Sequence, residues 1–108
     1  MNRKHVLGAA AGAIAATVDV IAIAAVDGGL GLVGLQAALF WLVAGWLVVL
    51  ADTGLGAISH ALIVTHALAA PWVLAEVGAG RPDHVVPMLV MNTVFAFGFA
   101  FAHSRARR

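Results

Sequence analysis

Residues 30–51 read LGLVGLQAALFWLVAGWLVVLA, a stretch without a charged residue or a histidine. Turn-forming residues bound it on both sides, DGG at 27–29 and DTG at 52–54. At 1.5 Å per residue, a helix of about 20 residues crosses the roughly 30 Å of hydrocarbon in a bilayer. Backbone groups in hydrocarbon must find hydrogen-bond partners within their own segment, so this stretch predicts a transmembrane helix.

The same pattern repeats along the rest of the chain. Apolar runs of similar length are separated by short turns, the last of which is GAGRPD at 78–83. The stretch FAFGFAF at 95–101 alternates as a strand would, but a lone strand in lipid leaves its backbone unpaired, so a helix is predicted there too. The sequence therefore predicts an all-α integral membrane protein, a single four-transmembrane-helix bundle over residues 1–108 with antiparallel neighbours and helices at about 6–26, 30–51, 55–77 and 84–103.

The composition excludes several other classes of protein. Residues of the types AVILMFWYC make up 63% of the chain and charged residues only 10%, whereas a soluble domain of 108 residues needs a more polar exterior. The absence of cysteine excludes disulfides and thiolate chemistry, and a net charge of +1 gives no sign of nucleic-acid binding. The turns are too short to house an active site outside the membrane, so catalysis is not expected unless a cofactor is bound.

Basic residues gather at the two ends of the chain. Five of the six Lys and Arg residues lie there: Arg3, Lys4, Arg105, Arg107 and Arg108. With four spans both termini lie on one side, and the positive-inside rule places that side in the cytoplasm. We therefore predict a protein of a prokaryotic-type inner or plasma membrane. An alternative for residues 1–15 is a secretory signal, with MNRKH as its basic region and the following apolar run as its core.

Small residues mark the predicted helix contacts. They are Gly8, Gly12 and Ala16 in the first span and Gly34 and Gly45 in the second. Stripes of small residues let helix backbones approach closely in a membrane. At 100° per residue, Asp19 lies about 20° from Gly8, so its carboxyl should face a neighbouring helix. Trp41, near the middle of the second span, is predicted to be a packing residue.

Three polar side chains on different spans share one depth. Counted from the basic ends, Asp19, His66 and Asn92 each lie about 16 to 20 Å into the hydrocarbon, near its midplane. An isolated charge there costs about 2.5 to 3.5 kcal/mol, so we expect Asp19 to meet His66, with Ser59 nearly on the face of His66. Such a pair can bind and release a proton. The alternative is a structural clasp between helices, worth about 0.6 kcal/mol.

Two further histidines suggest a cofactor. In an antiparallel hairpin of the last two spans, His60 comes level with His103. Histidines on two facing helices are a way of holding the iron of haem b. Apart from this haem, no cofactor or metal is expected.

Three functions remain open on these grounds. The first is a small transport or channel module, proton-linked through Asp19 and His66. It would work as a homo-oligomer, because four tightly packed helices rich in Ala and Gly leave little room for a path within one protomer. The second is an accessory or anchoring subunit of a larger membrane complex, with no chemistry of its own. The third is a haem-binding electron-transfer subunit. In each case the lipid bilayer is a partner.

Overall fold

A computed structural model describes residues 2–28 and 31–108 of the chain. In this part of the chain the elements are α1 (Arg3–Asp27), α2 (Gly31–Leu50), α3 (Ala57–Gly78), a short 3-10 helix η1 (Pro82–His84) and α4 (Val85–Ala106). Each of the four α-helices is long and apolar enough to cross a membrane. The predicted all-helical bundle is therefore confirmed, including the helix over residues 95–101.

The helix ends differ from the predicted ones by up to three residues, for identifiable reasons. α1 begins at Arg3 because the side chain of Asn2 caps it, accepting the backbone N–H of Lys4 at 2.9 Å. α3 begins two residues later than predicted, after Gly54 has turned the chain with φ of +76°. α4 continues to Ala106, because basic side chains are favourable in the last turn of a helix.

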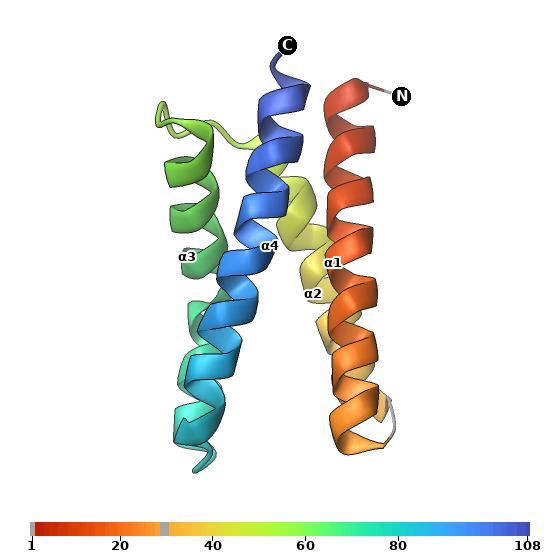
Figure 1. The fold of residues 1–108 in the computed structure, drawn as a ribbon, viewed down its shortest axis with the longest axis vertical. Coiled ribbons are helices and arrows are strands. Elements are labelled where there is room, and N and C mark those ends of the chain that lie inside the picture. The colour runs from red at the N-terminus through yellow and green to blue at the C-terminus, as the bar shows by residue number, and fades with distance from the viewer. Residues whose placement is uncertain (1, 29–30) are drawn as a thin grey trace.

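The four helices form two hairpins with both termini at one end of the bundle (Figure 1). We call this the terminal end. α1 packs mainly against α2, and α3 packs mainly against α4. Within the described residues no Cα atom of α1 lies within 8 Å of one in α3, and the two helices lie on opposite sides of α4 in Figure 1. α2 and α4 therefore connect the two hairpins.

Gly12 and Gly45 bring the backbones of α1 and α2 into direct contact. A Cβ atom on Gly12 would lie 2.5 Å from a backbone oxygen of α2, and one on Gly45 would lie 2.5 Å from the Cα of Gly12. No larger residue fits this contact without moving the helices apart. We call these two residues the glycine seam. The structure also buries the other small residues expected to pack, Gly8, Ala16 and Gly34.

The core of the bundle is aromatic at its centre and alanine-rich around it. Trp41 meets Phe95 edge to face, with ring centroids 4.6 Å apart, and lies 6.1 Å from the ring of Phe99. All three side chains are buried, together with alanines of every helix. Such aromatic pairs stabilise a core by about 0.5–1.5 kcal/mol beyond the area they bury. The core thus fixes the position of Trp41, which borders the site described next.

Candidate functional site

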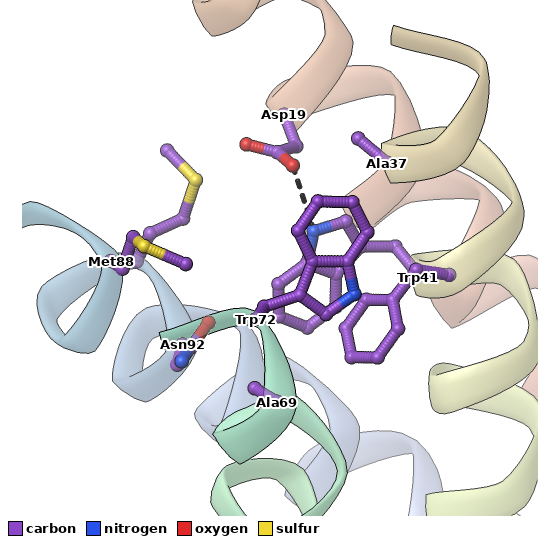
Figure 2. Close-up of a pocket in the computed structure, with 9 residues that line it drawn as sticks. Asp19, Ala37, Trp41, Ala69, Trp72, Met88 and Asn92 are labelled. Atoms are coloured by element: carbon purple, nitrogen blue, oxygen red, sulfur yellow. Dashed lines mark hydrogen bonds between the residues drawn. The ribbon is translucent and has the colours of Figure 1, made fainter. Parts of the chain in front are cut away.

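A cavity of about 70 Å³ lies where side chains of all four helices converge. Figure 2 shows its lining from α1, α2, α3 and α4. The lining residues are Asp19, Ala37, Phe40, Trp41, Ala69, Trp72, Met88, Met91 and Asn92. Since one water molecule needs roughly 10–15 Å³ of such space, the cavity has room for a few waters or a small ligand.

Asp19 projects from α1 into this cavity. Its Oδ2 accepts a hydrogen bond from Nε1 of Trp41 at 2.9 Å (Figure 2). The side chain is half-buried, and Trp41 is its one hydrogen-bond donor in the part of the chain that the structure describes. A carboxylate can accept about four hydrogen bonds, so Asp19 keeps capacity for a proton, a water molecule or a cation.

Asn92 lies on α4 across the cavity from Asp19 (Figure 2). Its side chain is 4% exposed, and its Nδ2 has no hydrogen-bond acceptor among residues 2–28 and 31–108. An unpaired buried donor costs roughly 1–3 kcal/mol, so it calls for an explanation. One is that the amide serves a ligand in the cavity. The hydroxyl of Thr65 is also buried without a partner, but it does not line the cavity.

Aromatic rings and methionines make up the apolar wall of the cavity. Phe40 meets two indoles at steep angles, with ring centroids 5.0 Å from Trp41 and 5.9 Å from Trp72. Met88 and Met91 of α4 complete the wall. The faces of aromatic rings attract cations placed within about 6 Å, and a neighbouring carboxylate adds negative charge. The lining therefore has the chemistry of a site for a small cation.

Asp19 and His66 do not form a hydrogen bond with each other in the structure. Nδ1 of His66 lies 2.7 Å from the carbonyl oxygen of Leu62 in its own helix, and Nε2 lies 3.4 Å from Oγ1 of Thr93 on α4. The predicted contact between Asp19 and His66 is wrong, because α1 and α3 do not pack against each other within the described residues. Ser59 is exposed. Of the predicted midplane residues, the cavity brings together Asp19 and Asn92.

His60 and His103 meet near the terminal end, as a stacked pair. Their ring centroids are 4.1 Å apart and their planes differ by 23°. Nε2 of His60 donates to a carbonyl oxygen of α2 at 2.7 Å, and Nδ1 accepts from the hydroxyl of Thr53 at 2.9 Å. Nε2 of His103 accepts from Nε of Arg107 at 3.0 Å, so Nδ1 carries the hydrogen and donates to another α2 carbonyl at 3.1 Å. This hydrogen-bond pattern fits two neutral imidazoles.

The stacked pair does not fit haem b. Two axial histidines must each aim an unshared nitrogen lone pair at an iron between them. In His60 and His103 the acceptor nitrogen already accepts a hydrogen bond, and the rings face each other with no space for a porphyrin.

Arg107 connects this histidine pair to the loop between α2 and α3. Its Nη2 donates to the carbonyl oxygen of Ala51 at 2.9 Å, and its Nη1 lies 3.5 Å from Oδ2 of Asp52. Oδ1 of Asp52 accepts the backbone N–H of Gly54 at 2.9 Å. The N–H of Gly54 and, after it, the charge of Arg107 hold the pKa of this exposed carboxyl below its ordinary value. We refer to His60, His103, Arg107 and Thr53 as the histidine cluster.

Sequence reasoning missed the role of Trp41 in the site. It predicted a packing residue, and Trp41 does pack, but its indole N–H also binds Asp19. The signal was present, because a buried indole N–H usually needs an acceptor and Asp19 is an acceptor near the same depth.

Comparison with protein-family models, with curated proteins and with solved structures finds no match to this chain. Its function is therefore inferred from its own residues.

Proposed function

We propose that this chain is a small membrane transport or channel module whose cavity beside Asp19 binds the proton or small cation that it moves. One observation carries the proposal. A half-buried carboxyl and an unpartnered buried amide line the same aromatic cavity. A purely structural polar contact would be expected to satisfy both groups.

The energetics of a carboxyl at this depth support proton linkage. At 1.5 Å per residue Asp19 lies about 24 Å along α1 from Arg3 and about 12 Å from Asp27, well inside the span. An ionised carboxylate deep in a bilayer costs about 2.5–3.5 kcal/mol unless it is neutralised. A proton or a bound cation neutralises it, and the aromatic wall adds attraction for a cation. Asp19 in this proposal alternates between a loaded and an unloaded state.

The proposal includes an orientation and an assembly. Five of six basic residues lie near the terminal end, so the positive-inside rule places both termini in the cytoplasm. A cavity of about 70 Å³ is too small to form a continuous path through one chain. The chain is therefore proposed to work as a homo-oligomer, in which the Asp19 cavity of each protomer opens onto a path that continues between protomers.

The test is proton or cation flux into liposomes that contain the purified chain. Asp19→Asn is nearly isosteric and cannot ionise, so it should keep the fold and the oligomeric state while flux falls to the level of empty liposomes. Asp83→Asn is the matched control, because Asp83 is exposed in η1 outside the cavity. It should leave flux unchanged.

Two results would reject the proposal. If Asp19→Asn conducts as well as the unaltered chain, the carboxyl has no transport role and an accessory subunit becomes the better hypothesis. If His66→Ala abolishes flux while Asp19→Asn does not, the proton site lies at the contact of His66 with Thr93 and not in the cavity.

A further inference from the structure

A long groove runs between α1 and α4, and it shares no lining residue with the Asp19 cavity. Its volume is about 600 Å³, and it is open to the surroundings. Small side chains form much of its wall, including Ala10, Ala11 and Ala15 on α1 and Gly98 on α4. Apart from one arginine, the residues that line it are apolar.

Gly98 leaves the groove open on the α4 side. A Cβ atom built on Gly98 would meet nothing within 4 Å, in contrast to the residues of the glycine seam. The buried side chains of Ala15 and Phe99 form part of the floor, and the exposed side chains of Ile14 and Phe101 stand at the rim. The groove is thus a slot that a flexible apolar chain can enter from the side.

Arg105 stands at the end of this slot that is nearer the terminal end. Its guanidinium carbon lies 5.6 Å from the ring centroid of Phe101, a cation–π distance that holds the side chain beside the groove. Among residues 2–28 and 31–108 no carboxylate is paired with Arg105. Because most basic residues of the chain share this end, the opening of the groove is positively charged.

The length of the groove matches one leaflet of a bilayer. On α4 it extends from Val94 to Arg105, which is about 16 Å at 1.5 Å per residue. Half of the roughly 30 Å of bilayer hydrocarbon is about 15 Å. A charged group at Arg105 and an apolar chain reaching Val94 therefore have the dimensions of a single phospholipid.

We infer that the α1–α4 groove binds one acyl chain of an anionic phospholipid, with the lipid phosphate on Arg105. Basic pockets between membrane helices are suited to anionic head groups. The inference requires that the chain lies in a membrane, but it does not depend on transport through Asp19.

The experiment measures lipid binding by native mass spectrometry of the purified chain, titrated with phosphatidylglycerol or phosphatidylcholine. The unaltered chain should bind one phosphatidylglycerol more tightly than phosphatidylcholine. Arg105→Gln should weaken phosphatidylglycerol binding about fivefold, since one basic residue contributes about 1 kcal/mol, and should remove the preference over phosphatidylcholine. Gly98→Leu should fill the slot and abolish tight binding of both lipids.

Two control variants make the result specific to the groove. Arg108→Gln removes a basic residue at the same end that does not line the groove, and Gly78→Leu adds the same side chain at an open glycine of α3. Both should bind lipid as the unaltered chain does. If Arg108→Gln weakens binding as much as Arg105→Gln, the attraction is diffuse and the site is rejected. Unchanged binding by Gly98→Leu, or loss of an oligomer in that variant, also rejects it, the latter in favour of a second chain in the groove.

Discussion

The histidine cluster and the Asp19 cavity both bury polar groups among apolar helices, but they differ in how completely those groups are hydrogen-bonded. In the histidine cluster all four ring nitrogens of His60 and His103 have partners at 2.7 to 3.1 Å. In the cavity Asp19 has one hydrogen bond, from Trp41, and Nδ2 of Asn92 has none among the described residues.

This difference separates a structural site from a candidate binding site. The histidine cluster has all its hydrogen bonds formed, so it has no capacity left for a ligand, and it holds α4 against the α2–α3 loop. The unpaired polar groups of the cavity lower the stability of the folded chain. That cost is explained if a ligand supplies the missing hydrogen bonds. Variants that alter one site but not the other test this distinction, beginning with the largest expected effect.

The first prediction concerns His60→Ala. The substitution removes a fully buried ring and leaves an α2 carbonyl and the Thr53 hydroxyl without partners. We expect the free energy of unfolding to fall by about 2–4 kcal/mol, measured by denaturation of the purified chain in detergent. Ser59→Ala, at the adjacent exposed position, should change it by less than about 0.5 kcal/mol. A loss below about 1 kcal/mol for His60→Ala would mean that the cluster is not a structural site.

The second prediction concerns Asn92→Leu, which should make the chain more stable. Leucine has a similar size and removes the unpaired amide, so the free energy of unfolding should rise by about 1 kcal/mol. Flux in liposomes should fall, because the cavity loses a polar group. Thr65→Val is the matched control. It also removes an unpartnered buried group, but outside the cavity, so it should stabilise the chain without reducing flux. A less stable Asn92→Leu variant would show that the amide is already satisfied.

The third and smallest effect concerns Asp52 at the edge of the histidine cluster. Its pKa is lowered in the folded chain from an ordinary value of 3.8, so its contribution to stability is present above that pH. This contribution of Asp52 begins to be lost below pH 3.8, and it is gone once the pH is below the lowered pKa that Asp52 has in the folded chain. Melting temperatures of the unaltered chain and of Asp52→Asn should therefore differ slightly at pH 6, and the difference should shrink as the pH is lowered below 3.8. A difference that stays constant over this range would exclude the ion pair and the Gly54 hydrogen bond as its cause.

The sequence predicted the helices well because their length and hydrophobicity are local properties. Four apolar runs between turns are sufficient to predict four helices, and only their ends needed the details of caps such as Asn2. The sequence also predicted that His60 and His103 lie at the same depth, because they are on two consecutive antiparallel helices. The register of a short hairpin is fixed by its turn, so residues at equal depth on α3 and α4 are neighbours.

The partner of Asp19 could not be predicted in the same way. Asp19 was paired with His66 because the two residues lie at the same depth in the bundle. Equal depth alone does not make two side chains neighbours. Which helices are adjacent depends on the lateral packing of the bundle, and within the described residues the backbones of α1 and α3 do not pack against each other. Trp41, on the helix that does pack against α1, provides the hydrogen bond instead.

The glycine seam has a consequence for motion. Gly12 and Gly45 lock α1 to α2, so Asp19 and Trp41 move as one body. Asn92 and Trp72 belong to the other hairpin, which has no glycine seam with the first. Any widening of the cavity is therefore expected to move Asn92 and Trp72 relative to Asp19, and not to separate Asp19 from Trp41. The carboxyl and its indole would travel together, and the distance from Asp19 to Asn92 would be the coordinate that changes as the cavity opens.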